Sequence, residues 1–132
     1  MSIEPTPEQI QRLVASDDQS PVVMINLLRF KDRADGIDAA DGISGAEAYR
    51  RYAEATRPFL EGVGARLLLA LAATESVVGP DHQEWDMMLA VEYPSRAAFL
   101  KMATNPDYLE IHAHRVAALS DARLIASTPA HM

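Results

Sequence analysis

The sequence predicts an α+β protein, because strand patterns and helix patterns alternate along most of its length. After a leading helix signal, the order is strand, helix, strand, and then strand, helix, strand again. Two β-α-β halves of this kind predict a ferredoxin-like βαββαβ subunit with a four-stranded antiparallel sheet. The chain has 132 residues, of which 48% are hydrophobic, which suits one domain with its own core. We expect a single domain over residues 1–132, with its core over about 21–127 and an extra N-terminal helix and turn over 1–20.

The start of the chain predicts one helix and one strand. Thr6 and Gln9 form a capping box, which predicts a short amphipathic helix that covers an edge or end of the sheet. Residues 22–30 (VVMINLLRF) form an apolar, branched run that predicts a buried strand. Asn26 interrupts this strand, and a buried amide needs a hydrogen-bond partner, which can be structural or a ligand.

A polar segment and a second helix follow. Residues 31–42 contain two Asp-Gly pairs, so we expect a loop, and a loop of this composition could serve as a mobile flap. A second capping box begins at Ser44 and opens a helix in which Tyr49 and Tyr52 share one face. Pro58 predicts a kink in this helix, which should then end at one of the glycines that follow.

The second half of the chain predicts two strands, a broken helix and a closing strand. Residues 65–76 are nearly all apolar, and residues 85–93 alternate large apolar side chains with other types. Ser95 is a natural N-cap for the next helix. Asn105 followed by proline breaks that helix and starts another, which should run to about residue 119. Residues 122–127 then predict the last strand.

A sheet with helices on only one side leaves its other face bare. The apolar residues in this sequence suffice for two faces, and an uncovered apolar face of that size promotes aggregation. The economical cover is a second copy of the chain, placed sheet against sheet across a two-fold axis. We therefore expect a homodimer.

The overall composition excludes several classes of partner. The net charge is −7, and no strong cluster of Lys and Arg occurs, so we expect no binding to nucleic acid or to an anionic membrane. The chain has no cysteine, which excludes disulfides and thiolate chemistry. No signal-peptide pattern and no membrane-length apolar run occur, so we expect a cytoplasmic protein.

Three side chains at helical spacing form the first candidate site. Tyr108, His112 and Arg115 share one face of the last predicted helix. In this arrangement Arg115 could pair with a substrate carboxylate, and His112 could transfer a proton near neutral pH. The alternative is structural, with Arg115 in an ion pair to an acid such as Asp86.

The second candidate site combines an amide, phenols and an indole, which commonly surround the apolar cavities that bind small molecules. The alternative is a core aromatic cluster whose polar groups satisfy one another. We expect the ligand-binding residues to be Asn26, Tyr49, Tyr52, Trp85, Asp86 and Tyr108, with His112 and Arg115 as candidate catalytic residues.

We expect no metal and no cofactor. His112 and His114 are two positions apart on a helix, so their rings point about 200° apart and cannot share an ion. His82 lies in a loop without a recognisable ligand spacing. No dinucleotide-binding, phosphate-loop or serine-hydrolase motif occurs in the chain.

Three segments of the sequence resemble the family named domain of unknown function 1330, of the dimeric α+β barrel superfamily. They are PVVMINLLRFK, AYRRYAEATRPFLEGVGARLL and EWDMMLAVEYPSRAAFLKMATNPDYLEIHAHRVAALSDARLI. The resemblance covers roughly Pro21 to Ser127, and its most specific parts are the Tyr-Pro-Ser-Arg strand end, the Asn-Pro-Asp-Tyr segment and Arg115. It implies a ferredoxin-like subunit that pairs into a barrel, with a pocket between sheet and helices in each subunit, and it implies no reaction. The leading helix and the Asp-Gly loop exceed the compact family core.

Three functions stay open from the sequence. The first is a small-molecule-binding protein or cofactor-free enzyme, whose ligand is a small carboxylate or an aromatic molecule. If it is an enzyme, His112 is the expected base, and Arg115 or Asn26 would stabilise negative charge. The second is a cofactor-free monooxygenase, a class that includes haem-degrading enzymes of the same superfamily, using Asn26, Trp85 and His112. The third is a structural or interaction dimer with its pocket packed shut.

Overall fold

The fold is described from a computed structural model, in which residues 2–82 and 84–131 are placed. The helices and strands, in chain order, are α1 (Pro7–Ala15), β1 (Val22–Phe30), the 3₁₀ helix η1 (Gly36–Asp41), α2 (Gly45–Gly62), β2 (Arg66–Ala72), β3 (Met87–Tyr93), α3 (Arg96–Ala103), α4 (Pro106–Ala118) and β4 (Leu119–Ser127).

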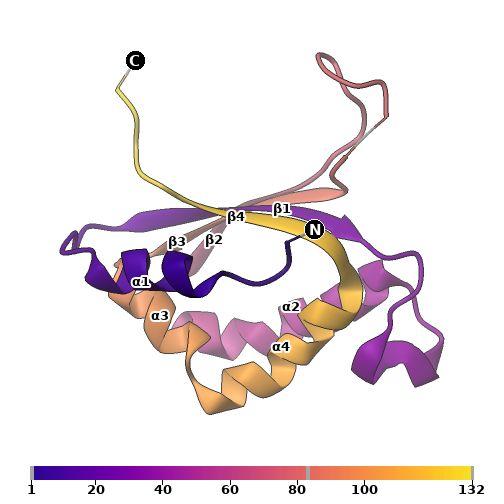
Figure 1. The fold of residues 1–132 in the computed structure, drawn as a ribbon, viewed down its shortest axis with the longest axis horizontal. Helices are drawn as coiled ribbons and strands as arrows, with labels where there is room; N and C mark the ends of the chain where they lie inside the picture. The colour runs from indigo at the N-terminus through magenta and orange to yellow at the C-terminus, as the bar shows by residue number, and fades with distance from the viewer. Residues whose placement is uncertain (1, 83, 132) are drawn as a thin grey trace.

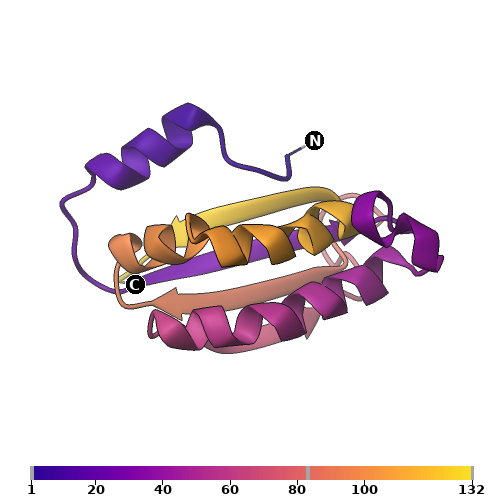
Figure 2. The same cartoon turned by 90° about the horizontal axis from the view of Figure 1, so that it is seen from below.

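The four strands form one antiparallel sheet in the order β2-β3-β1-β4. Helices α2, α3 and α4 cover one face of this sheet, as Figures 1 and 2 show from two sides. In the centre of the sheet, Asn26 lies opposite Leu89 of β3 and Leu124 of β4. This arrangement confirms the predicted α+β, ferredoxin-like subunit with an extra N-terminal helix.

Side-chain hydroxyls and amides begin the helices where the sequence predicts. Thr6 forms a full capping box with Gln9, and Ser95 accepts a hydrogen bond from the amide of residue 98. Asn105 accepts one from the amide of Asp107, with proline at the first position of α4. These short-range bonds satisfy amides that have no partner within the helix, which is why the helix starts are readable from sequence.

Several element ends differ from the sequence expectations. Strand β2 covers Arg66–Ala72 rather than 65–76, and β3 begins at Met87 rather than at residue 85. Strand β4 begins at Leu119, directly after α4. The end of α2, by contrast, agrees with the expectation, because the helix continues past Pro58 and ends at Gly62. Pairing with a neighbouring strand decides where a strand ends, and no single-strand pattern contains that information.

The Asp-Gly segment is not a flap in this structure. It contains η1, which packs against α4, and Asp38 within it is only 1% exposed. One oxygen of Asp38 accepts a hydrogen bond from Arg51 at 3.1 Å, and the other lies 2.8 Å from Nδ1 of His114. A buried carboxylate with two such partners holds the segment in place, because an unpaired buried charge is costly.

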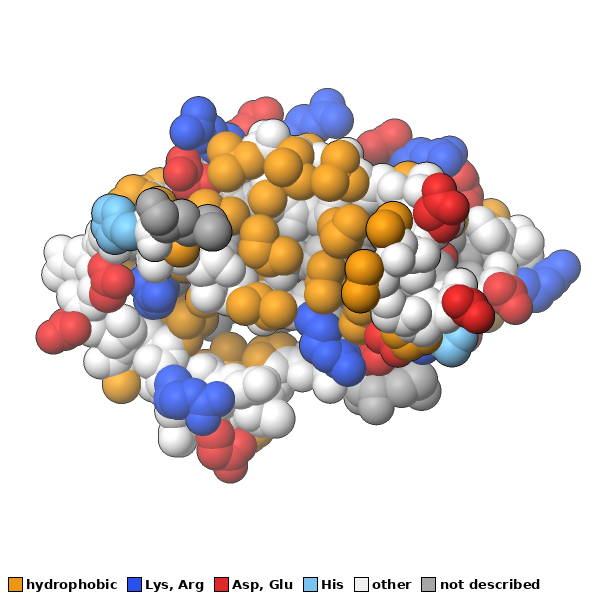
Figure 3. Space-filling model, turned by 90° about the horizontal axis from the view of Figure 1, so that it is seen from above, with side chains coloured by type: hydrophobic (Ala, Val, Ile, Leu, Met, Phe, Trp, Pro, Cys, Tyr) orange, Lys and Arg blue, Asp and Glu red, His pale blue; other side chains and the backbone are white. Residues whose placement is uncertain are grey.

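The sheet face opposite α2, α3 and α4, called the outer face below, is not covered by any described part of the chain. Leu69 and Leu71 of β2 are 46% and 50% exposed there, and Ile125 of β4 is 50% exposed. Figure 3 shows hydrophobic side chains gathered across the middle of this face. The connection between β2 and β3 projects on the same side (Figure 1), and Val77 and Val78 within it are among the most exposed large hydrophobic residues.

Helix α1 contacts α3 and lies on the same side of the sheet as the other helices (Figure 1), beyond the edge strand β4 (Figure 2). None of its residues is buried. Residues 2–5, called the N-terminal segment below, lead to α1 and pass along the edge strand β4. The first helix therefore lies outside the main layer rather than across the sheet.

Candidate ligand cavity

A cavity of about 1420 Å³ lies between the sheet and its helices. Its floor is the helix-facing side of the sheet, including Met24 of β1 and Leu89 and Val91 of β3. Helices α2, α3 and α4 form the opposite wall, and α1 with the N-terminal segment borders it along the side of β4. Ligand cavities in proteins usually have about 300–1,000 Å³ and are mainly apolar with a few polar groups. This cavity is large enough for a small molecule.

Two phenols meet at the wall of the cavity. The hydroxyls of Tyr52 on α2 and Tyr108 on α4 are 2.7 Å apart, and both side chains are buried. Burial and the neighbouring Tyr52 raise the pKa of the Tyr108 phenol, and burial likewise raises the pKa of Tyr49, which also lines the cavity. Phenols with raised pKa values stay protonated near neutral pH, so they act as hydrogen-bond donors rather than as bases.

His112 continues this polar chain to the protein surface. Its Nδ1 lies 3.4 Å from the Tyr108 hydroxyl, a long contact, and its Nε2 lies 2.8 Å from Oε1 of Glu4. The chain Tyr52–Tyr108–His112–Glu4 therefore links a buried phenol to a carboxylate of the N-terminal segment. One consistent arrangement has the Tyr108 hydroxyl donating to Nδ1 and the Nε2 proton donated to Glu4.

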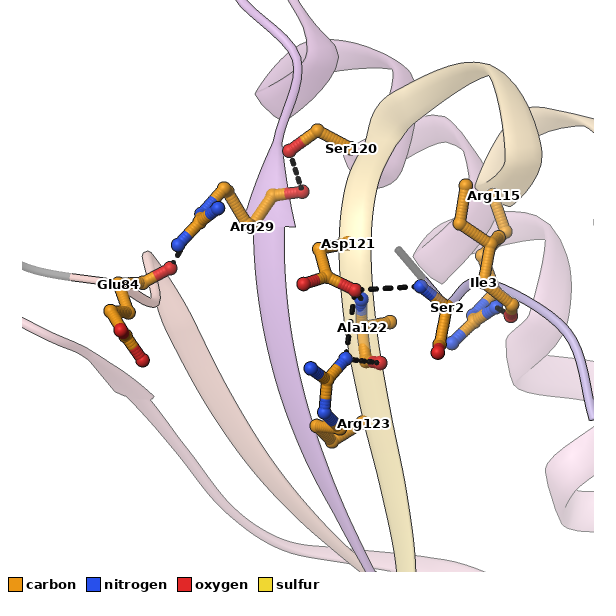
Figure 4. A network of polar contacts seen from close by, with 9 residues as sticks. All are labelled: Ser2, Ile3, Arg29, Glu84, Arg115, Ser120, Asp121, Ala122 and Arg123. Atoms are coloured by element: carbon orange, nitrogen blue, oxygen red, sulfur yellow. Dashed lines mark hydrogen bonds and ion pairs between the residues drawn. The ribbon is translucent and has the colours of Figure 1, made fainter.

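Arg115 is a buried cation at the same wall, 7% exposed. Its Nη1 donates a hydrogen bond to the carbonyl of Ile3 at 2.6 Å, as Figure 4 shows. Within residues 2–82 and 84–131, no carboxylate lies at ion-pair distance from this guanidinium. The expected structural alternative, an ion pair with Asp86, is therefore wrong.

The N-terminal segment is fixed to the edge of the sheet next to this site. The amide of Ser2 donates to Oδ1 of Asp121 at 2.8 Å, and the amide of Ala122 donates to the carbonyl of Ser2 at 2.7 Å (Figure 4). The hydrogen bond from Ser2, together with Arg123, lowers the pKa of Asp121 to about 2. The carboxylate of Asp121 is thus charged at neutral pH and anchors the segment.

Asn26 and Thr56 add two polar groups to the lining of the cavity. The amide nitrogen of Asn26 donates to the carbonyl of Met24 at 3.3 Å. Thr56 is 4% exposed, and its hydroxyl has no hydrogen-bond partner among the described residues. Sequence reasoning did not propose Thr56 as a site residue, although its spacing of four from Tyr52 places both on one face of α2.

Trp85 and Asp86, which the sequence analysis counts among the ligand-binding residues, do not line the cavity. The guanidiniums of Arg29 and Arg123 lie 5.7 and 5.2 Å from the Trp85 ring centre, on the outer face of the sheet. The carboxylate of Asp86 accepts a hydrogen bond from the amide of Phe30 at 2.8 Å. Strand β3 begins only at Met87. Residues 85 and 86 therefore lie before the strand, where the alternation of side chains between the two faces of a sheet does not apply.

The structure thus brings together six of the eight predicted site residues: Asn26, Tyr49, Tyr52, Tyr108, His112 and Arg115. It does not assemble the Asn26, Trp85 and His112 set, since Trp85 lies on the outer face. Across the described ranges, no group of three or more His, Asp or Glu side chains is placed to hold a metal ion. Likewise, none of the described helices is long and apolar enough to cross a membrane.

The chain is similar to several proteins of known structure. A protein of unknown function from Rhodopseudomonas palustris is 36% identical, with a TM-score of 0.89 over 98% of each chain. A dabb family protein with a ferredoxin-like fold from Mesorhizobium loti is 13% identical, with a TM-score of 0.56 over 86% of this chain and 100% of that one. SnoaB, a cofactor-independent oxygenase from Streptomyces nogalater, is 12% identical, with a TM-score of 0.56 over 86% of this chain and 96% of that one. The two distant likenesses show the fold alone.

The family assignment rests on a family model that matches more than half of the chain. A search of curated proteins found no match. The family model for domain of unknown function 1330 matches residues 39–128, a span that includes α2, α4 and the cavity residues on them. The chain therefore belongs to the family of domain of unknown function 1330 (DUF1330), and its structural neighbours are ferredoxin-like dimeric α+β barrel proteins.

Proposed function

We propose that this protein binds a small, largely apolar molecule in the cavity between its sheet and helices. The observation that carries the proposal is the cavity itself, about 1420 Å³ in volume. The side chains of Asn26, Thr56, Tyr108, His112 and Arg115 line it from both walls. An apolar space with a few converging polar groups is the usual form of a ligand site.

A matched pair of variants tests whether ligands occupy this cavity. Ala70 of β2 lines the cavity, so Ala70→Phe should fill part of it and weaken binding. Ala97, exposed on α3 and outside the lining, provides the control Ala97→Phe. Thermal-shift measurements with 2-naphthoate, 1,4-naphthoquinone and haem should show stabilisation in the wild type and Ala97→Phe, and less in Ala70→Phe. If none of the three compounds stabilises the wild-type protein, the structural alternative of a closed dimer is favoured instead.

A cofactor-free enzyme that acts on the bound ligand is the second candidate. The chain from Tyr52 through Tyr108 and His112 to Glu4 supports it, because such a chain can pass a proton between the cavity and the surface. With a turned-over substrate, His112→Asn should lower kcat by about 100-fold or more with little change in binding. Oxygen uptake in the presence of a reduced naphthoquinone tests the monooxygenase hypothesis. Equal rates of oxygen uptake with and without the protein would contradict this hypothesis.

The outer face supports a homodimer as the assembled form. Leu69, Leu71 and Ile125 expose apolar surface across it, and a second copy placed sheet against sheet would bury all three. Leu71→Lys should shift the protein towards monomer in sedimentation velocity, whereas Val14→Lys on α1, 64% exposed, should leave it a dimer. A wild-type protein that sediments only as a 14.4 kDa species at micromolar concentration contradicts the dimer.

A further inference from the structure

The charge of the cavity is opposite to that of the whole protein. The chain carries a net charge of −7. Around the cavity, however, arginines outnumber acids, because Arg12, Arg50, Arg57 and Arg115 line it with Glu4 and Glu61, and Arg50 is paired with Glu47. Arg12, Arg57 and Arg115 have no acidic partner within ion-pair distance in the described part of the chain. Such a lining attracts a small anion.

Arg115 is the buried member of this set and therefore the one with the strongest need for a counter-charge. A guanidinium has five N–H donors, and a buried cation is normally paired with an anion. Among the described residues, the Arg115 side chain has one hydrogen bond, to the neutral carbonyl of Ile3. A ligand carboxylate could accept two parallel hydrogen bonds from the same group, which is a shorter and stronger interaction than a bond to a neutral carbonyl.

The N-terminal segment already presents acceptors to both candidate catalytic residues. The carbonyl of Ile3 lies on Arg115, and the carboxylate of Glu4 lies on His112. Apart from these contacts, Ser2 is bonded to Asp121 and Ala122 at the edge of β4, and α1 contacts α3 without burying any of its own residues. Displacing the segment from the cavity would therefore cost few buried apolar contacts.

We propose that the cavity binds a carboxylate attached to an apolar ring system, and that the N-terminal segment occupies the carboxylate site when no ligand is bound. The incoming carboxylate replaces the Ile3 carbonyl on Arg115 and the Glu4 carboxylate on His112, and the ring system lies on the apolar floor formed by β1 and β3. Binding thus releases the N-terminal segment together with α1. This inference rests on the proposed binding function and adds the ligand class and the element that competes with it.

Matched acid and amide probes test the ligand class without any mutation. In isothermal titration calorimetry, 2-naphthoate should bind the wild-type protein about 10- to 100-fold more tightly than 2-naphthamide, since a charge-assisted pair replaces a neutral hydrogen bond. Arg115→Met keeps an unbranched, largely apolar stem without the charge and should remove this preference, and Arg115→Lys should reduce it. Glu4→Gln weakens the competing segment and should raise the affinity for 2-naphthoate by about fivefold.

The release of the N-terminal segment has its own readout. Because the chain has no cysteine, Gln11→Cys on α1 gives a single site for a fluorescent label. Saturating 2-naphthoate should lower the anisotropy of this label, whereas a label at Ala97→Cys on α3 should not change. Saturation with 2-naphthamide should leave both labels unchanged.

The outcomes separate this inference from the proposed function. Equal binding of 2-naphthoate and 2-naphthamide by the wild type, with both weakened by Ala70→Phe, overturns the carboxylate site and keeps the binding function. Preferential binding of the acid with unchanged anisotropy at position 11 overturns the competing role of the N-terminal segment. Absence of binding by either probe counts against the proposed function and against this inference.

Discussion

Replacing Gly45 with alanine should destabilise the fold by about 3 kcal/mol or more. Gly45 is the first residue of α2, the helix that carries Tyr49, Tyr52 and Thr56 to the cavity. A Cβ atom added there would lie 2.3 Å from the carbonyl oxygen of Lys31 and 2.6 Å from that of Ala118. Both neighbours are backbone atoms, so no side-chain rotation can relieve the contact.

The magnitude follows from what must move. The amide of Gly45 donates to the carbonyl of Lys31 at 3.0 Å, and the amide of Lys31 donates to the carbonyl of Ala118 at 2.8 Å. Moving the start of α2 away from the ends of β1 and α4 strains or breaks these bonds, each contributing about 1 kcal/mol. Distortion of the surrounding packing adds about 1–3 kcal/mol. For a domain of this size, a loss of 3 kcal/mol lowers Tm by roughly 10 °C.

Urea denaturation followed by far-ultraviolet circular dichroism measures this loss, and Gly62→Ala is its control. Gly62 is the last residue of α2, and a Cβ atom there would have nothing within 4 Å. Alanine favours a helix over glycine, so Gly62→Ala should raise the free energy of unfolding by up to about 1 kcal/mol. If Gly45→Ala unfolds within 1 kcal/mol of the wild type, the junction between α2, β1 and α4 is looser than the structure shows, and the reasoning is refuted.

Four further substitutions test polar groups in and beside the site. Tyr52→Phe and Tyr108→Phe should each lower the free energy of unfolding by about 1–2 kcal/mol, and the double variant should lose less than the sum, because each change leaves the other hydroxyl unpaired; additive losses in urea denaturation would show that the hydroxyls do not interact. Thr56→Val should raise the free energy of unfolding by up to about 1 kcal/mol, because it removes a buried hydroxyl without a partner; a clear loss in the same assay would contradict this. Asp121→Asn should lower Tm at neutral pH, because the folded state holds the charged carboxylate more favourably than the unfolded state does. The difference in Tm from the wild type should vanish as the pH falls from the ordinary carboxyl pKa of 3.8 towards 2, where the carboxylate becomes protonated. A constant difference between pH 7 and pH 2 would exclude the charge of Asp121 as the source of the stabilisation.

Local chemistry made most of the fold predictable. The cap residues Thr6, Ser95 and Asn105 act on amides within three positions of themselves, so their role is visible in a short stretch of sequence. The stripe of Tyr108, His112 and Arg115 also depends only on helical spacing, and the structure places all three at the cavity. Residues on one face of one helix share their surroundings wherever the helix packs.

Contacts between distant parts of the chain were not predictable in the same way. Arg115 is hydrogen-bonded to Ile3, and His112 to Glu4, and in each pair the two residues are more than 100 positions apart in the sequence. Nothing near Arg115 in sequence indicates that a backbone carbonyl, rather than an acid, is its partner. The error at Trp85 has a different origin, because β3 begins two residues later than the alternation suggests. The guanidinium groups of Arg29 on β1 and Arg123 on β4 lie against the ring on the outer face.

The charge of the protein illustrates why a global property and a local site can favour different ligands. The net charge of −7 repels polyanions such as nucleic acids, which meet a wide area of the surface. At physiological ionic strength, however, exposed charges are screened beyond about 8 Å. A small carboxylate inside the cavity would therefore respond mainly to the charges that line it, where arginines outnumber Glu4 and Glu61, and only weakly to the acids elsewhere on the surface. The same chain can exclude a polyanion from its surface and select a monoanion within its cavity.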